Sequence, residues 1–550
     1  MKNRDEITSF NKAPTVNISR SRFPMKQRIW TTFNTGDLVP IFTYLDVLPG
    51  DTFNLSYSMV VRQSTSLKPT MDDAFIDIFC FDIPWRLLWE HTKEFFGENT
   101  QGAWTQTTEY LIPKLTTPEG GMAKGTVAEK MGIPINRANI DFSALGVRAY
   151  CLTYSEWFRD QNLIAPPTLY KDDTDRIANN EVTELGGKMF KVAKYHDYFT
   201  SSLPEPQKSP MGAVTLPLGT TAPVITAQNI NDTFSGESLQ WANKDGSVFA
   251  GDAGFAFPLA VGVPSAGQTI TENGVSGITA GGDIVPANLI TDLSQALAAT
   301  INSQRYAFAL QKAYEKDARG GTRYREIIKN HFLVTSPDAR QQVPEYLGGT
   351  HIPLQLVQTA QTSESTETSP QANLAAYGHT SGAFKGFSKS FTEHSVLLIL
   401  ACVRTKHSYS QGLNRMWSRR RRFDLYWPVF MNLGEQAVLN KEIFAQGTDV
   451  DNEVFGYQER WAEYRYLPDL VCGAFRPDYE QSLDFWLYTD DYETLPVLSQ
   501  EWIEEPVGNM DRTLAVESDL EDQFIANFQF VIDSSRPMEK YSIPGLVDHH

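Results

Sequence analysis

Strict alternation of apolar and polar side chains marks the stretch TFNLSYSMVV, which follows the turn at 49–51. Every second residue from Phe53 to Val61 is apolar, and most of those between are polar. This period of two predicts a strand with one face on a core and one face outward. The runs AFIDIFCFDIP and HSVLLILACVRT are apolar at almost every position, which is typical of strands covered on both sides. Because these strands lie far apart in the chain, the pattern predicts a β-rich core with long excursions between strands.

Helical spacing of apolar residues occurs within those excursions. The stretch PWRLLWEHTKEFFGE predicts a helix that starts after Pro84 and ends near Gly97, and TYSEWFRDQNL predicts a shorter one. The clearest helix is predicted over about 291–317, ended by Gly320-Gly321, and TRYREIIKNHF predicts one more. Stripes of this kind favour core packing over a ligand site.

The segment 213–290 differs from its surroundings in composition. It holds eleven of the 37 glycines, six acidic residues, a single lysine and no arginine, and apolar residues recur throughout. A loop of this length either carries structure of its own or is disordered. The apolar content favours an ordered, β-rich insertion that projects outward over a flexible linker between two domains.

Basic residues gather in two places, although the chain has a formal net charge of −18. Residues 1–30 have little apolar periodicity and contain Pro14 and Pro24, so they predict a flexible basic arm that is either solvated or bound to an anionic surface. The second place is QGLNRMWSRRRRFDLYWP, where four consecutive arginines stand among aromatic residues. Such a run is typical of nucleic-acid contact, of a protein interface or of a solvated face. The candidate anion-binding residues are Arg20, Arg22, Lys26, Arg28, Arg419, Arg420, Arg421 and Arg422.

An acidic chain cannot coat nucleic acid with its whole surface, so any such contact must be local. The stretch 478–524 has fourteen acidic residues and a single arginine, interleaved with aromatic side chains that argue against a disordered tail. This acidic segment could pair with a basic surface of the same subunit or of a neighbouring one.

The residues give little support for an enzyme, a metal site or a cofactor site. No phosphate-binding loop, dinucleotide fingerprint, zinc-protease motif or nucleophile elbow occurs. Glu501, Glu504 and Glu505 could be imagined as a glycosidase pair, and Asp490-Asp491 as a calcium site, but clustered acids are usually just solvated. The four cysteines are expected to be buried, reduced thiols, as in a reducing compartment. The first ten residues have no apolar secretory signal, and the longest aliphatic run, VLLILACV, is too short to cross a bilayer.

Several long blocks resemble one known family. They include SRFPMKQRIWTTFNTGDLVPIFTYLDVLPGDTF, DDAFIDIFCFDIPWRLLW, KYHDYFTSSLPEPQK, ALQKAYEKDARGGTRYREIIKNHFLVTSPDARQQVPEYLGG and QGLNRMWSRRRRFDLYWPVFMNLGEQ. In content and order, from about residue 20 to 480, they are similar to the major capsid proteins of the Microviridae, in particular those of the gokushovirus branch. The segment 213–290 and the acidic C-terminal part match mainly in position and character.

The resemblance implies a mainly β fold: an eight-stranded antiparallel jelly roll with long helical and loop insertions between strands. Next to the basic arm that the composition predicts over 1–30, it implies a core formed by 31–212 and 291–550 and a protrusion over 213–290 at the three-fold axes with a use in host attachment. It also implies self-assembly into a T=1 icosahedral shell around circular single-stranded DNA, as part of a virion assembled in a bacterial cytoplasm. The implied partners are a small basic DNA-binding protein, an internal scaffolding protein and a DNA-pilot protein.

Two alternatives stay open at the level of sequence. A secreted carbohydrate-binding or glycoside-cleaving β-protein would share the strands and aromatic residues, but would need a signal peptide or a convergent acid pair. A tandem β-domain protein would use 213–290 as a hinge and remain a monomer. For the four arginines, DNA contact and pairing with the acidic segment of a neighbouring subunit are about equally favoured.

Overall fold

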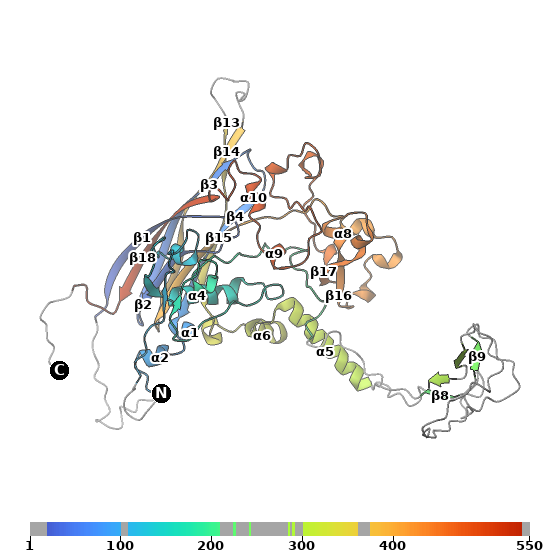
Figure 1. Cartoon of the computed structure of the whole chain (residues 1–550), viewed down its shortest axis with the longest axis horizontal. Helices are drawn as coiled ribbons and strands as arrows, with labels where there is room; N and C mark the ends of the chain where they lie inside the picture. Colours follow the sequence, from blue (N-terminus) through green and yellow to red (C-terminus); the bar gives the residue numbers. More distant parts are fainter. Residues whose placement is uncertain are drawn as a thin grey trace, which may run out of the picture. The chain divides into compact units, whose positions relative to one another are not determined.

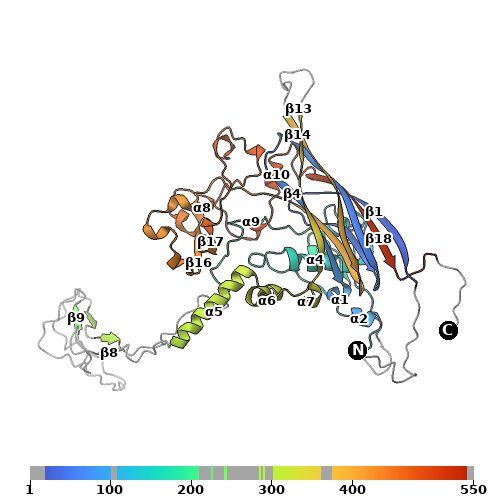
Figure 2. The ribbon, with the colours of Figure 1, turned by 180° about the vertical axis from the view of Figure 1, so that it is seen from behind.

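The computed structural model of the 550-residue chain describes residues 19–100, 108–209, 224–226, 241–243, 284–286, 289–291, 301–360 and 374–541. The chain divides into two compact units (Figures 1 and 2). One comprises Met1–Lys208 and Glu315–His550, and the other comprises Ser209–Tyr314. We call the first the core unit.

Two antiparallel sheets form the centre of the core unit. The first has the strand order β1-β18-β3-β14-β13, and the second has the order β12-β4-β15-β2. Their bounds are β1 Ser21–Phe33, β2 Val39–Val47, β3 Thr52–Ser66, β4 Ala74–Pro84, β12 Glu345–Pro353, β13 Leu356–Ala360, β14 Leu374–Ser390, β15 Ser395–Thr405 and β18 Phe524–Arg536.

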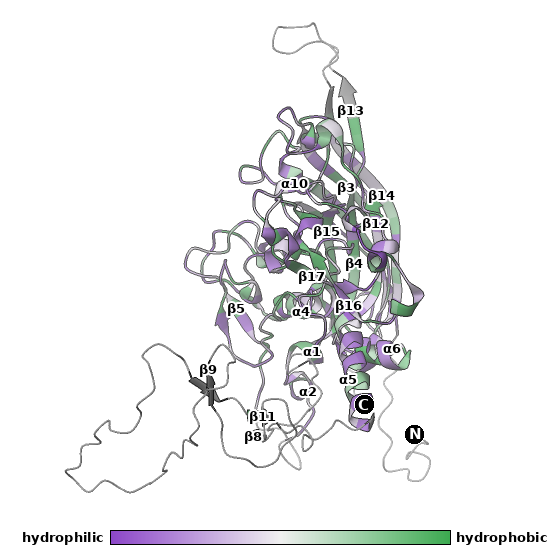
Figure 3. Cartoon of the chain, turned by 90° about the vertical axis from the view of Figure 1, so that its right-hand side faces the viewer, coloured by the Kyte–Doolittle hydropathy of each residue, from purple (hydrophilic) through white to green (hydrophobic). Residues whose placement is uncertain are grey.

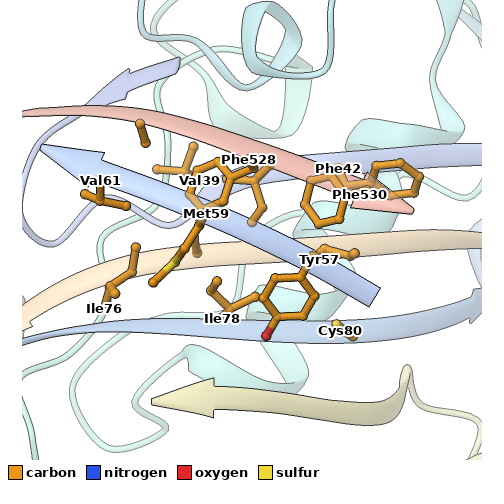
Figure 4. Close-up of a cluster of buried hydrophobic side chains, with 14 of the residues drawn as sticks. Val39, Phe42, Tyr57, Met59, Val61, Ile76, Ile78, Cys80, Phe528 and Phe530 are labelled. Atoms are coloured by element: carbon orange, nitrogen blue, oxygen red, sulfur yellow. The ribbon is translucent and has the colours of Figure 1, made fainter. Parts of the chain in front are cut away.

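A hydrophobic core lies between these two sheets. On β3 the side chains of Phe53, Leu55, Tyr57, Met59 and Val61 are all buried, as the alternating pattern predicts. They pack with alternate residues of β18 from the same sheet and with residues of β2, β4 and β15 from the other sheet. Figure 4 shows this packing around Tyr57, Met59, Phe528 and Phe530. The prediction of a half-buried strand is confirmed, and the fold is a β-sandwich.

The four-stranded sheet is covered on both faces. Along β15, Leu397, Ile399, Ala401 and Val403 belong to the core between the sheets. The alternate residues, from Val396 to Cys402, pack in a second core with side chains from the excursion 85–192. The prediction of strands buried on both sides is therefore confirmed. In Figure 3 the hydrophobic colour follows these strands, whereas the peripheral β5 and α2 are largely hydrophilic.

Apart from the long helix α5, the described parts of the excursions carry short helices and strands and no further large sheet. The strands are β5 Lys114–Thr116, β6 Asp141–Ser143, β7 Arg176–Ile177, β16 Glu435–Leu439 and β17 Val454–Glu459. The helices are α1 Trp85–Leu88, α2 Thr92–Phe95, α3 Val127–Lys130, α4 Leu145–Thr153, α5 Ile301–Gly320, α6 Tyr324–Phe332, α7 Asp338–Gln341, α8 Asn440–Ile443, α9 Gln500–Ile503 and α10 Gly508–Asp511. A π-helical turn, Tyr154–Phe158, continues α4.

The helix predictions are confirmed in position but not in length. The helix predicted over 85–97 is split into α1 and α2, and the short helix predicted at 153 begins eight residues earlier, at Leu145. Of the long helix predicted over 291–317, the structure describes Ile301–Gly320 as helix α5, whereas Leu289–Thr291 is strand β11. The helix α6 agrees with its prediction.

The flexible arm predicted over 1–30 is wrong for residues 21–30, and residues 1–18 lie outside the described part of the chain. Strand β1 pairs with β18 along its whole length, from Ser21 opposite Arg536 to Phe33 opposite Phe524. Met25 and Ile29 pack against the core between the sheets, which supplies the free energy for ordering this segment. Pro24 is tolerated because β1 is the edge strand of its sheet.

In the unit Ser209–Tyr314 the structure describes two short antiparallel strand pairs within the predicted insertion. Strand β8 (Val224–Thr226) pairs with β11 (Leu289–Thr291), and β9 (Trp241–Asn243) pairs with β10 (Ile284–Pro286). The other residues of 213–290 lie outside the described part.

We predict that Phe530→Ala lowers the free energy of unfolding by about 3–5 kcal/mol, because it removes an aromatic ring buried between the sheets. Its ring centroid lies 4.9 Å from that of Phe42 and 6.0 Å from that of Tyr57. The neighbouring outward residue serves as the control: Gln529→Ala should change the value by less than about 0.5 kcal/mol. Urea unfolding of the purified subunit measures both, and equal effects would contradict the assignment of faces.

Candidate assembly and nucleic-acid surfaces

Three of the four basic residues predicted near the N-terminus stand on one face of one strand. Arg22, Lys26 and Arg28 lie at even-numbered positions of β1, all three are exposed, and the residues that alternate with them include Met25 and Ile29 of the core side. Arg22 forms an ion pair with Asp533 of β18, with 2.6 Å between Nη2 and Oδ2. Arg20 is exposed just before the strand. Strand pairing therefore holds these cations in a fixed row.

The four consecutive arginines do not act as one group. Arg419 turns toward its own chain: its guanidinium lies 3.2 Å from a carboxylate oxygen of Glu463 and 4.1 Å from the ring centroid of Tyr464. Arg415, one turn upstream, donates to the carbonyl of Ala437 on β16 at 2.7 Å and pairs with Glu442 of α8 at 3.1 Å. Arg415 thus anchors the segment to β16 and α8, and Arg419 anchors it to the turn at Glu463 and Tyr464.

The other three arginines remain exposed. The carboxylate of Asp424 accepts the backbone N–H groups of Arg420 and Arg421 at 2.9 and 2.7 Å, and these hydrogen bonds lower the pKa of Asp424. Arg422 places its guanidinium 4.6 Å from the ring centroid of Trp427. Within the described residues, no ion pair joins Arg420, Arg421 or Arg422 to the acidic stretch 478–524, so the structure does not show pairing with that stretch inside one subunit.

Exposed apolar side chains crowd the same segment. Ten large apolar residues between 413 and 433 are more than a third exposed: Leu413, Met416, Trp417, Phe423, Leu425, Tyr426, Trp427, Val429, Met431 and Leu433. We call residues 411–434 the Arg–aromatic segment. Scattered apolar residues on a surface are ordinary, but a concentration of them in one short segment is typical of an interaction site. Because the segment packs on β16 and α8, it lies on the opposite side of the core unit from β1 and β18 (Figures 1 and 2).

Part of the acidic stretch is buried rather than on the surface. The imidazole of His407 lies between two carboxylates, with Nδ1 2.7 Å from Asp490 and Nε2 2.9 Å from Glu505. Lys194 adds a further cation 3.0 Å from Asp490. Burial alone would lower the pKa of His407, but the two carboxylates outweigh it and raise the pKa to about 10. Burial would likewise raise the pKa of Asp490, but His407 and Lys194 hold it well below its usual range.

The buried His407 cluster gives structural roles to Glu505 and Asp490, which the sequence offered as part of a glycosidase pair and of a calcium site. Glu505 accepts hydrogen bonds from the backbone and hydroxyl of Thr405, at 2.9 and 2.6 Å, besides its contact with His407. The carboxylate of Asp490 accepts hydrogen bonds from His407, Lys194 and Tyr492. These carboxylates therefore hold the C-terminal stretch against the chain after β15. The described residues contain no group of three His, Cys, Asp or Glu side chains suited to a metal ion.

Cysteine placement agrees with the prediction at three positions of four. Cys80, Cys151 and Cys402 are buried free thiols, and burial raises the pKa of Cys80 to about 12. Cys472 is exposed, which corrects the expectation of burial for that residue. It lies in a stretch of short turns between Leu470 and Phe475 that enters neither of the two cores described above.

The comparisons with known proteins cover nearly the whole chain. A family model described as "Capsid protein (F protein)" matches residues 11–546. This chain belongs to that family. It is 41% identical over 546 residues to capsid protein VP1 of Bdellovibrio phage phiMH2K, covering 98% of this chain and 97% of that protein. It is 40% identical to capsid protein VP1 of Spiroplasma virus 4, covering 96% of each, and 36% identical to capsid protein VP1 of Chlamydia phage 1, covering 99% of this chain and 98% of that one.

Membership of the F protein family confirms the resemblance to Microviridae capsid proteins and gives this chain a structural role in a virion. It favours that role over the carbohydrate-active and tandem-domain alternatives. No helix among the described residues is both long enough and apolar enough to span a membrane. For a capsid protein, the surfaces that bind other copies of the same chain are the candidate functional sites.

We predict that His407 stays protonated well above neutral pH. Its folded-state pKa is about 10 against about 6.5 unfolded, so its contribution to stability is complete below pH 6.5 and is lost as the pH rises toward 10. Asp490 has a lowered pKa, so its contribution is present above about pH 4 and is lost in acid.

Histidine-selective NMR of the isotope-labelled subunit tests this directly. The His407 resonance, assigned by its absence in His407→Gln, should show no titration between pH 5.5 and 8.5. A midpoint near pH 6.5 would contradict a charged imidazole between the two carboxylates.

Proposed function

We propose that this chain is the major capsid protein of a small phage and that its copies close into a T=1 icosahedral shell around a circular single-stranded DNA genome. The observation that carries the proposal is the match to the capsid protein family over residues 11–546, together with three relatives at 36–41% identity that are named capsid protein VP1. Assembly would take place in the bacterial host cytoplasm.

The proposal includes an eight-stranded jelly roll. Strand order supports it: β1-β18-β3-β14 stand side by side in one sheet, and β12-β4-β15-β2 in the other. The chain therefore crosses from one sheet to the other at each step along β1, β2, β3 and β4. It does so again along β12, β14, β15 and β18. Two interleaved Greek keys give this order, and the jelly roll is an architecture of viral capsid domains. The long excursions 85–344 and 406–523 interrupt the roll without changing its strand order.

We assign the Arg–aromatic segment to contact between subunits. Interface cores are enriched in Tyr, Trp, Phe, Met and Arg, which is the composition of this segment. Ten exposed apolar side chains would bury their surface only if another protein surface covered them. Acidic residues of a neighbouring subunit could pair with Arg420, Arg421 and Arg422. Interfaces of standard size bury on the order of 1,600 Å² in total, and repetition around a closed lattice makes moderate contacts collectively strong.

We assign Arg20, Arg22, Lys26 and Arg28 to the inner wall. An acidic shell repels an anionic genome, so cations have to be concentrated where the DNA lies. The row of exposed cations on β1 meets this requirement and lies away from the Arg–aromatic segment. A small basic DNA-binding protein would supply further charge, with an internal scaffolding protein and a DNA-pilot protein as the other partners.

The insertion 213–290 is proposed as an outward protrusion at the three-fold axes that serves in host attachment. The two short strand pairs, β8–β11 and β9–β10, support an insertion with its own β structure. The basic segment 1–30, the jelly-roll core of 31–212 and 291–550, and this protrusion are then the three functional parts. We propose no enzymatic activity.

Electron microscopy of the purified protein tests the proposed function. The expected result is uniform hollow shells of one diameter, formed either by the protein alone or on addition of its scaffolding protein. Stable monomers under both conditions, at high protein concentration, would overturn the proposal.

The double substitution Arg420→Ser, Arg421→Ser tests the contact between subunits. We expect it to reduce shell yield at least tenfold even without DNA, because it removes two cations from the proposed interface. The control is Lys26→Ser, Arg28→Ser, which removes the same charge from β1 and should leave empty-shell yield unchanged while lowering the DNA content of shells. Light scattering and the absorbance ratio at 260 and 280 nm measure the two effects. Normal empty-shell yield from the first variant, with reduced DNA content, would instead place these arginines on the DNA.

A further inference from the structure

The register of the five-stranded sheet defines its outward face residue by residue. Pairing of β1 with β18, of β18 with β3 and of β3 with β14 aligns outward positions into rows that cross all four strands. One row is Lys26–Val531–Ser56–Lys385, the next is Arg28–Gln529–Ser58–Ala383, and the row of Thr32 and Ile525 continues to Arg62 and His379. We call this surface, from the row of Arg22 to the row of Arg62, the outer sheet face.

The outer sheet face is positive, in contrast to the chain as a whole. Its basic residues are Arg22, Lys26 and Arg28 on β1, Arg62 on β3 and Lys385 on β14, and its one acidic residue is Asp533. The whole chain has 66 acidic and 48 basic residues. Only the cations of β1 form a cluster in the sequence, because Arg62 and Lys385 join them through strand pairing alone.

Between the cations the outer sheet face consists mainly of small hydrogen-bonding side chains. Serine, threonine, asparagine and glutamine fill about half of its positions, among them Asn54, Ser56, Ser58, Asn527 and Gln529. Hydroxyl and amide groups with Arg and Lys are the groups that proteins use to bind phosphate and sugar. Such contacts position a nucleic-acid strand without reading its sequence.

Apart from the carboxylate of Asp522, which accepts a hydrogen bond from the hydroxyl of Thr32 at one edge, the described residues leave this face open. Strand β3 has neighbours on both sides, yet Asn54, Val60 and Arg62 on it are exposed. An aromatic ring also stands in solvent here: Trp30 of β1 is 69% exposed. Exposed rings beside a basic surface are the platforms on which unpaired bases stack.

We propose that the outer sheet face binds single-stranded DNA without sequence preference, with Arg62 and Lys385 contacting phosphates and Trp30 stacking on a base. This assignment rests on the proposed function, and it extends the DNA contact from one row of cations on β1 to four strands of the sheet.

A second copy of the chain is a poorer occupant than DNA. Interfaces between subunits favour large apolar side chains at their centres. On the outer sheet face such residues are separated by serine, asparagine and charged positions, whereas the Arg–aromatic segment has ten exposed apolar side chains in 21 residues. Ion pairs with an acidic partner subunit would involve the cations but would not account for the many serine, threonine, asparagine and glutamine side chains of this face.

Salt-dependent binding of an oligonucleotide tests the proposal. Fluorescence anisotropy of a labelled 30-nucleotide oligo(dT) with the full-length protein gives the slope of log affinity against log salt concentration. Each phosphate contact to a single strand contributes about 0.7 to this slope. Arg62→Ser, Lys385→Ser should therefore reduce it by about 1.4. The matched control, Lys93→Ser, Arg340→Ser, removes the same charge from exposed positions of α2 and α7 and should leave the slope within about 0.3.

Trp30→Ala separates stacking from charge. We expect it to lower affinity by about fivefold or more, the loss of one base–aromatic contact, with the slope unchanged because no cation is removed. A fall in the slope as large as that of Arg62→Ser, Lys385→Ser would mean that Trp30→Ala disturbs strand β1 and its cations rather than base stacking alone.

Two outcomes would overturn the assignment of this face. One is a salt slope that is equal in the wild type and in Arg62→Ser, Lys385→Ser, or a control variant whose slope falls by as much as that of Arg62→Ser, Lys385→Ser. The other is a failure of Arg62→Ser, Lys385→Ser to form shells without DNA, which would make the face a subunit contact. Shell formation by the wild type, seen by electron microscopy, is scored separately, so a failure of the proposed capsid function is distinguishable from a failure of this assignment.

Discussion

Strand β15 imposes the main constraint on this fold, because its side chains have to be kept from water on both faces of the sheet. Its inner residues, such as Leu397 and Ile399, pack against the five-stranded sheet. Its outer residues, such as Leu398 and Leu400, pack against the excursion 85–192. A strand of this composition is stable only within three layers. The order of layers follows: excursion, four-stranded sheet, five-stranded sheet. The outer sheet face is what remains open to water.

The same layering separates the two surfaces to which we assign subunit contact and DNA contact. The long excursion after β15 carries the Arg–aromatic segment and is held by Arg415 and Arg419 to β16, α8 and Glu463. It is also tied to the core unit through His407, Asp490 and Glu505, a cluster that would be costly to leave unpaired. Apolar contact surface is thereby concentrated on one side of the core unit, and the small polar and basic side chains of the outer sheet face on the other.

Local patterns in the sequence were sufficient where burial is periodic. The alternation at 53–61 and the continuous apolar runs at 74–84 and 395–405 gave the correct faces, because burial of a strand leaves a direct trace in its own residues. Strand β1 was missed since charged residues and Pro24 interrupt its apolar positions, and its partner β18 lies about 500 residues away in the chain. Long-range pairing of this kind has no local signal.

The candidate surfaces were predictable only in part, for a related reason. The arginine run is visible in sequence, but the inward turn of Arg419 depends on Glu463 and Tyr464, 44 and 45 residues later. Likewise, Lys194, His407 and Asp490 meet in the fold from distant positions, and the sequence suggested solvated acids instead. In the sequence Arg62 and Lys385 are isolated charges, and only the strand register places them on the same face as the cations of β1.

The most direct test of this account is a cryo-electron microscopy reconstruction of the assembled particle at side-chain resolution. The account predicts that the outer sheet face lines the interior cavity, with density for nucleic acid over Arg62 and Trp30, and that residues 411–434 are buried between neighbouring subunits. An outer sheet face turned to the particle exterior or covered by another subunit, or an Arg–aromatic segment left in solvent, would contradict it.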